Sequence, residues 1–114
     1  MTEIAHASDA HASIAEIIKS HPIVLFMKGS PSHPQCGFSA AVVAVLRHYD
    51  APVHTVDVLM DPALRQGIKT YSDWPTIPQL YIHGAFVGGC DIVREMHASG
   101  ELRDLIAARL GARS

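Results

Sequence analysis

The stretch IVLFMKGSPSHPQCGFSAAVVAVL, residues 23–46, decides the fold. It begins with an uninterrupted apolar run rich in branched and aromatic side chains, which predicts a strand buried on both faces. Residues 29–35 contain two prolines and two serines and predict a loop. From Gly37 to about His48, apolar residues recur at helical spacing. The stretch therefore predicts a strand, a loop and a helix, with Cys36 at the point where the loop meets the helix.

The segment before this stretch predicts a helix. Ser13 can cap that helix, although Ser8 can start it earlier. The helix is expected to end before Pro22, because the residue that precedes a proline disfavours helical backbone angles. We expect residues 1–7 to be a disordered N-terminus and residues 8–114 to form a single domain.

The chain after this stretch alternates between strands and helices. Later strands are expected over three segments: residues 53–59, 79–82 and 85–88. Later helices are expected in three places: from Asp61-Pro62 onward, over residues 90–96 and over residues 101–110. The first two strands are linked by a helix and should be parallel, whereas the last two are joined by a His83-Gly84 turn and should form an antiparallel hairpin. This order predicts an α/β fold of the thioredoxin-like layout, a four-stranded mixed sheet with helices on both faces.

Composition argues against several classes of protein. The chain has 114 residues and a net charge of −2, and no stripe of basic residues suggests a nucleic acid partner. No apolar run approaches the roughly 20 residues that a membrane span requires. The first residues lack the basic and apolar regions of a secretory signal. Two cysteines do not make a disulfide framework, so we expect a soluble cytoplasmic protein.

Cys36 is the candidate reactive residue. Free N–H groups and the positive end of the helix dipole favour its thiolate, and Lys28 can add a positive charge. The alternative is an inert, half-buried cysteine. A Cys-x-x-Cys protein would have its second cysteine at the position of Ser39, and a serine cannot resolve a mixed disulfide. The site must therefore use a thiol from outside the chain, or hold something that thiolates ligate. The eight histidines show no paired spacing that would predict a metal site.

Four motifs in register carry a family resemblance. They are Lys28, Cys36-Gly-Phe-Ser39, Trp74-Pro-Thr-Ile-Pro78 and Gly88-Gly-Cys-Asp91. From about residue 8 to residue 110, the chain closely resembles a monothiol glutaredoxin of the CGFS type, in its short single-domain form. The resemblance implies the glutaredoxin fold.

The resemblance also implies a function. Two such chains hold one [2Fe-2S] cluster between them, with one metal-ligating Cys36 from each chain and two bound glutathiones. A [2Fe-2S] cluster takes four thiolates, which agrees with this arrangement. The chain is then expected to store the cluster, to help assemble it or to transfer it to recipient apo iron–sulfur proteins, often with a BolA-type partner.

Two groups of residues are candidates for binding the glycyl end and the backbone of glutathione. Lys28, Arg65 and Lys69 suit the glycyl carboxylate, although the pair on one helix face can be an ordinary solvated surface. The backbone of Ile77, before a Pro78 that is cis in the family, pairs with the peptide of glutathione. Thr76 lines the same wall, or is a turn residue with a local hydrogen bond.

The Gly88–Asp91 turn is the candidate for the γ-glutamyl end of glutathione. N–H groups from Gly89 onward suit its carboxylate and Asp91 suits its ammonium, although Asp91 can instead cap the helix. Cys90 can be a buried filler with backbone contact to glutathione, a second redox thiol or a cluster ligand, and packing is the preferred interpretation. Phe38 covers the thiol or touches a partner, or else lies on the core face of its helix.

Three functions compete. The leading hypothesis is a cluster carrier rather than an enzyme. The second is a glutathione-dependent oxidoreductase that removes glutathione from proteins, with Cys36 as nucleophile. The third is an adaptor that senses iron through a BolA-type partner, and it uses the same site as the first.

Overall fold

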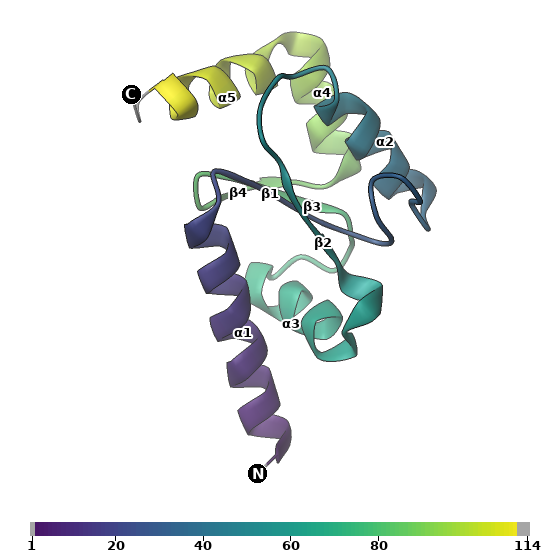
Figure 1. Cartoon of the computed structure of the whole chain (residues 1–114), viewed down its shortest axis with the longest axis vertical. Coiled ribbons are helices and arrows are strands. Elements are labelled where there is room, and N and C mark those ends of the chain that lie inside the picture. The colour runs from purple at the N-terminus through teal and green to yellow at the C-terminus, as the bar shows by residue number, and fades with distance from the viewer. Residues whose placement is uncertain (1, 112–114) are drawn as a thin grey trace.

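The computed structural model describes the backbone of residues 2–111 and the side chains of residues 9–107 (Figure 1). Along the chain, the helices and strands are α1 (Thr2–Ser20), β1 (Ile23–Met27), α2 (Gly37–Leu46), β2 (His54–Asp57), the 3-10 helix η1 (Val58–Met60), α3 (Pro62–Ser72), β3 (Gln79–Ile82), β4 (Ala85–Gly88), α4 (Cys90–Ser99) and α5 (Glu101–Gly111). The four strands form one sheet in the order β2-β1-β3-β4. This is the predicted mixed sheet of the thioredoxin-like layout.

The sheet pairs as its connections require. β1 runs parallel to β2, with Val24 opposite His54, and antiparallel to β3. β3 and β4 form the hairpin, whose turn residues His83 and Gly84 have φ values of 54° and 85°. Left-handed angles at both central positions match the right-handed twist of the strands. β1 is buried along its whole length, as the apolar run predicts.

The helices cover both faces of the sheet (Figure 1). On one face, α1 and α3 pack over a core that includes Ile14, Phe26 and Ile68. On the other face, α2, α4 and α5 pack over a core that includes Leu25 and Val93. Residues that alternate along β1 point to opposite faces, so its side chains enter both cores in turn. β1 is thereby held in place by packing on both sides.

Several element boundaries differ from the sequence predictions; α4, for example, continues to Ser99. α1 begins at Thr2, before both Ser8 and Ser13, and no glycine or proline interrupts residues 2–20. The expected disorder of residues 1–7 stays a prediction, and residues 112–114 of the expected domain lie outside the described part. The second strand ends at Asp57 and not at residue 59, because the Asp57 side chain accepts the Leu59 N–H at 3.0 Å and caps η1.

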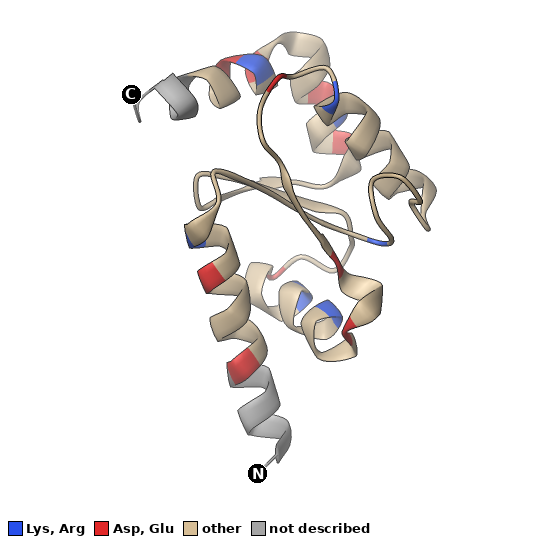
Figure 2. Cartoon of the chain, in the orientation of Figure 1, with Lys and Arg blue, Asp and Glu red and all other residues tan. Residues whose placement is uncertain are grey.

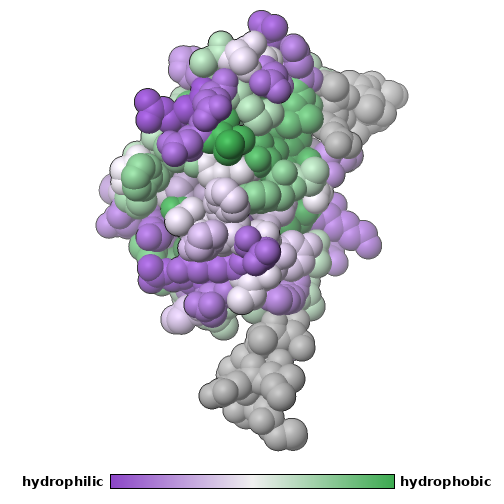
Figure 3. Space-filling view, turned by 180° about the vertical axis from the view of Figure 1, so that it is seen from behind, coloured by the Kyte–Doolittle hydropathy of each residue, from purple (hydrophilic) through white to green (hydrophobic). Residues whose placement is uncertain are grey.

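The surface of the described part is mixed. The described part of α1 and α4 carry charged residues of both signs, whereas the charged residues within α3 are basic (Figure 2). Seen from behind, hydrophobic residues gather in the upper half of the molecule, between hydrophilic ones (Figure 3). Among the described helices, none combines the length and the apolar character that crossing a lipid bilayer would require.

Candidate functional site

A pocket of about 480 Å³ opens where five segments meet: the end of β1, the start of α2, the last turns of α3, the loop before β3 and the start of α4. It is lined by Lys28, Cys36, Phe38, Lys69, Trp74, Pro75, Thr76, Ile77, Pro78, Gly89, Cys90, Asp91 and Ile92. Nine of the ten residues that the sequence analysis predicts to bind glutathione or the cluster are in this set, as is Phe38. Arg65 is not, although its helix reaches the pocket through Lys69.

The loop before Cys36 folds back on itself. The Gln35 N–H donates to the Lys28 carbonyl at 2.9 Å, and Ser30 and His33 exchange backbone hydrogen bonds at 3.3 and 3.1 Å. Gly29 has a φ of 88° and donates its N–H to an Asp57 carboxylate oxygen at 2.9 Å. The loop is therefore closed by its own backbone and tied to the end of β2.

Cys36 is the N-cap residue of α2, in extended conformation, and its side chain is half-buried. The pKa of this thiol lies below the usual range, chiefly because the Ser39 backbone N–H hydrogen bonds to the sulfur. Burial opposes the effect, while the Phe38 N–H, the charge of Lys28 and the Ser39 hydroxyl add to it. The start of a helix and one lysine thus favour the thiolate form, in the direction that the sequence predicts, and the reactivity of Cys36 stays a prediction.

Ser39 is fully buried. Its hydroxyl oxygen accepts the Lys28 N–H at 3.1 Å, so it joins the end of β1 to the first turn of α2. The residue that stands where a second cysteine would be is therefore part of the scaffold under the thiol. Since a hydroxyl cannot displace a disulfide, the chain offers one exchangeable sulfur at this edge of the pocket.

Alkylation of Cys36 by iodoacetamide is expected to follow a pH profile with a midpoint below that of the same thiol in the unfolded chain. Because the thiolate is the reactive form, a lowered pKa keeps the folded protein reactive at lower pH. Lys28→Met is expected to move the midpoint upward, since it removes a positive charge near the sulfur. The measurement is the alkylation rate at Cys36, followed by mass spectrometry from pH 5 to pH 10. Lys19→Met, at the end of α1, is the control that should leave the profile unchanged; equal midpoints in both variants would contradict the role of Lys28.

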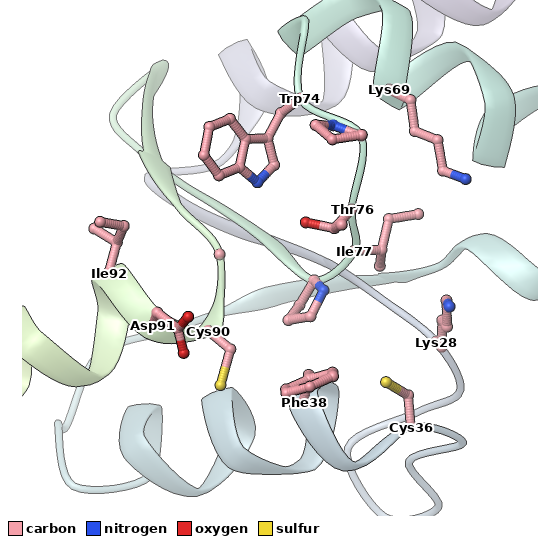
Figure 4. Close-up of a pocket in the computed structure, with 13 residues that line it drawn as sticks. Lys28, Cys36, Phe38, Lys69, Trp74, Thr76, Ile77, Cys90, Asp91 and Ile92 are labelled. Atoms are coloured by element: carbon pink, nitrogen blue, oxygen red, sulfur yellow. The ribbon is translucent and has the colours of Figure 1, made fainter.

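The charged residues of the pocket lie at its two ends. Lys28 and Lys69 are at one end and Asp91 is at the other, with Thr76 and Ile77 between them (Figure 4). Within the described residues the single ion pair joins Arg103 to Asp104, so none of these three charges has an ionic partner. A pocket with cations at one end and an anion at the other suits a short peptide that carries both signs of charge.

The wall between these ends is the segment 74–78. Its Ile77–Pro78 peptide bond is cis, in agreement with the resemblance. Among the backbone hydrogen bonds of the described residues, none uses the Ile77 N–H or carbonyl. The Thr76 side chain is exposed, and within the same part of the chain its hydroxyl has no hydrogen-bond partner. Its carbonyl accepts a local hydrogen bond from Gln79 Nε2 at 3.1 Å, so the turn interpretation and the role as a wall residue both stay open. The wall therefore presents backbone and hydroxyl groups that an extended peptide can use.

The opposite wall is the start of α4. Its N-cap is Gly89, and no side chain caps the helix. Asp91 lies in the first turn and is exposed, so the alternative in which Asp91 is the cap is wrong. Cys90 is 8% exposed and belongs to the core cluster, which supports packing as its main role. The uncapped N–H groups of this helix and its dipole favour an anionic ligand.

Three lining residues have no role in the sequence analysis: Trp74, Pro75 and Ile92. Trp74 and Pro75 belong to a quoted motif, whereas nothing in the sequence marks Ile92 beyond its place next to Asp91. Phe38 is 64% exposed at the rim, so it does not lie on the core face of α2. These apolar side chains line the pocket together with its charged and polar residues.

The described residues contain no group of three or more His, Cys, Asp or Glu side chains arranged to hold a metal ion. Two pairs of histidine rings are in contact, His21 with His54 and His48 with His97. Both pairs lie outside the pocket lining, so Cys36 and Cys90 are the soft ligands that the pocket contains.

Comparisons with known proteins agree on one family. The family model described as "Glutaredoxin" matches residues 23–87, from β1 to β4. Over 100 residues the chain is 53% identical to the chloroplastic monothiol glutaredoxin-S7 of rice, Oryza sativa, which covers 88% of this chain and 60% of the rice protein. This chain thus spans about three-fifths of that relative. It is also 45% identical over 104 residues to a monothiol glutaredoxin of Synechocystis, with 91% of this chain and 97% of that one covered.

A solved structure shows the same architecture. The reduced apo form of poplar GrxS14 superposes with a TM-score of 0.76 at 48% identity, and the match covers 87% of this chain and 91% of the poplar chain. The order of strands and helices around the pocket is therefore shared with a protein of clear sequence similarity.

Proposed function

The chain belongs to the glutaredoxin family, and from that premise we propose that it binds glutathione beside Cys36 and that two copies together carry one [2Fe-2S] cluster. The proposal depends above all on one observation: a half-buried thiol of lowered pKa at the start of α2, beside a pocket whose charges have no ionic partner among the described residues. Members of this family work with glutathione. Binding of the cluster and its transfer go beyond what membership of the family implies, and we propose them in addition.

The charges of glutathione match those of the pocket. The tripeptide has a carboxylate at its glycyl end, and a carboxylate and an ammonium at its γ-glutamyl end. Lys28 and Lys69 suit the first, while the uncapped start of α4 and Asp91 suit the second. The Ile77 backbone lies between them and can pair with the peptide. In this orientation the cysteinyl sulfur of glutathione lies on the side of Cys36.

The donor set fits a shared cluster. A [2Fe-2S] cluster takes four thiolates, and one chain offers one open thiolate, Cys36. Two chains and two glutathiones supply four. Cys36 would hold the iron of the cargo cluster, and the charged ends of the pocket would hold the glutathione that completes its coordination. The chain does not close the coordination shell by itself, which suits a protein that gives the cluster away.

Partners follow from that role. We propose a homodimer bridged by the cluster, recipient apo iron–sulfur proteins, and a BolA-type protein that can replace one copy. A thiolate and glutathione also require a reducing compartment, and the cytoplasm is our proposal for it.

A second candidate function rests on the lowered pKa of Cys36. As a nucleophile, the Cys36 thiolate attacks the glutathione sulfur of a protein mixed disulfide, forms a Cys36–glutathione disulfide and expels the protein thiolate. A second glutathione thiolate then attacks the bound glutathione sulfur, which frees Cys36 and leaves glutathione disulfide. Because Ser39 cannot take part, the outside thiol is obligatory.

Two assays on the same preparation separate the candidates. Reconstitution with iron, sulfide and reduced glutathione is expected to give a brown dimer, followed by visible absorbance and size-exclusion chromatography. A mixed-disulfide reductase assay is expected to give slow turnover compared with a dithiol glutaredoxin. Fast turnover with no cluster would establish the reductase and reject the carrier.

Cys90→Ser is expected to keep most of the cluster absorbance. The Cys90 side chain is packed in the core cluster, and its replacement by serine leaves Cys36 and the glutathione pocket in place. The measurement is absorbance per chain after reconstitution, beside a glutathione titration. Loss of the cluster with unchanged affinity for glutathione would instead make Cys90 a ligand.

A further inference from the structure

Gln79, the first residue of β3, is a fully buried polar side chain that lies behind the pocket and not in it. Burying a carboxamide is unfavourable unless its polar atoms find partners. Its neighbours on the same face of the sheet are apolar, since that face carries the core of α1 and α3. A residue of this kind is expected to hold its position through its hydrogen bonds and not through packing alone.

The carboxamide of Gln79 makes three hydrogen bonds. Its Nε2 group donates to the Trp74 carbonyl at 3.1 Å and to the Thr76 carbonyl at 3.1 Å. Its Oε1 atom accepts the Tyr81 hydroxyl at 3.4 Å. Burial raises the pKa of Tyr81 to about 12, so this hydroxyl keeps its proton and donates. The donor to Oε1 orients the carboxamide with both N–H bonds toward the 74–76 segment.

The 74–76 segment has few other ties. The Trp74 N–H is held by the Lys69 carbonyl and the Ser72 hydroxyl, both at 3.1 Å, where α3 ends at a left-handed Asp73. Within the described residues, no other hydrogen bond reaches the backbone between Pro75 and Pro78. The Gln79 carboxamide thus holds the backbone of the 74–76 segment in place through its two hydrogen bonds.

A shift of this wall would reach the opposite side of the pocket. A Cβ atom built on Gly89 would lie 3.3 Å from the Pro78 carbonyl oxygen and 3.6 Å from the Trp74 indole nitrogen. The two walls therefore lie close together at the start of α4, and the width of the pocket there depends on where residues 74–78 lie.

We propose that Gln79 is a positioning residue for glutathione: from behind the wall, its carboxamide holds Trp74 and Thr76 so that Ile77 faces the peptide at the right distance from Cys36. This inference rests on the proposed glutathione site and names the residue that sets its width. Gln79 touches no ligand, and its effect passes through the two carbonyls that it binds.

Gln79→Met tests the proposal, since it keeps the length of the side chain and removes both N–H donors. The Kd for reduced glutathione, measured by calorimetry, is expected to rise about tenfold. Losses of this size are typical when a residue that holds a ligand-binding group in place is removed. Trp74 is the single tryptophan of the chain, so its fluorescence reports on this wall directly. We expect a shifted emission maximum and easier quenching by acrylamide. The alkylation pH profile of Cys36 should not move, because the thiol is stabilised from α2 and Lys28.

Ile106→Ala, on the buried face of α5 and away from the pocket, is the matched control for stability. It should lower the melting temperature while leaving the Kd and the Trp74 fluorescence unchanged. If Gln79→Met does not fold, Tyr81→Phe takes its place: it frees Oε1 and should raise the Kd a few-fold with a smaller fluorescence change. A folded Gln79→Met protein with the Kd of the parent chain would overturn the proposal, as would an equal rise in Kd for Ile106→Ala. Absence of binding by the parent chain would instead reject the glutathione site itself.

Discussion

Cys36→Ser is expected to stay colourless and monomeric after reconstitution with iron, sulfide and glutathione. In the proposed arrangement each chain would contribute the Cys36 sulfur to a shared site, so the substitution would remove two of the four thiolates that a [2Fe-2S] cluster takes. A serine hydroxyl is not deprotonated near neutral pH and is a poor ligand for iron in such a cluster. The loss should therefore be complete, and visible absorbance with size-exclusion chromatography measures it.

The glutathione pocket should survive this substitution. Serine at position 36 can still cap α2, and Lys28, Lys69 and Asp91 are untouched. Glutathione affinity is therefore the internal control that the chain is folded. A brown dimer formed by Cys36→Ser would show that another residue ligates the cluster, and the proposed arrangement would have to be abandoned.

Gly29→Ala is expected to lower the free energy of unfolding by about 3 kcal/mol and to disorder the loop before Cys36. Gly29 has a φ of 88°, and a Cβ atom there would lie 2.5 Å from the His33 carbonyl oxygen and 2.7 Å from the Gln35 amide nitrogen. Both atoms are backbone, so neither can move without opening the loop. Urea unfolding followed by circular dichroism measures the loss.

Gly84→Ala is the matched control for this prediction. Gly84 has nearly the same φ, 85°, but a Cβ atom there meets nothing within 4 Å. It should lose only about 1 kcal/mol, the cost of a left-handed angle for alanine. The difference between the two variants isolates the clash at Gly29. Equal losses would show that the loop can open to accept a side chain.

Much of the fold could be predicted from local pattern. The apolar run of β1 and the His83-Gly84 turn have strong signals, and both are confirmed. The predicted start of α1 was wrong because a serine can cap a helix but need not, and because no glycine or proline before Ser8 ends the helical segment. The predicted end of β2 was wrong because the apolar residues of η1 continue the strand pattern in the sequence. Only the structure shows that the Asp57 side chain caps η1 and ends the strand.

The sequence predicted those residues of the site that belong to recognisable motifs. Arg65 was misplaced because i, i+4 spacing puts two residues on one helix face but does not say which end of that face reaches a pocket. Ile92 was missed because it lines the pocket only through the position of α4 in the fold, which no local sequence motif indicates. Gln79 has no sequence signal as a support, since its partners are backbone carbonyls, which every residue possesses.

The absence of a side-chain cap on α4 has a consequence for the evolution of this protein. The N-cap of α3 is Asp61, whose carboxylate accepts two N–H groups, whereas the N-cap of α4 is Gly89, so no side chain caps the first amides of α4. A capping residue at position 89 would contribute about 1 kcal/mol to the ligand-free chain and would block the groups that select the ligand. If the proposed ligand binds here, stability of the ligand-free chain and recognition of the ligand make opposite demands on this one residue, and glycine meets the second.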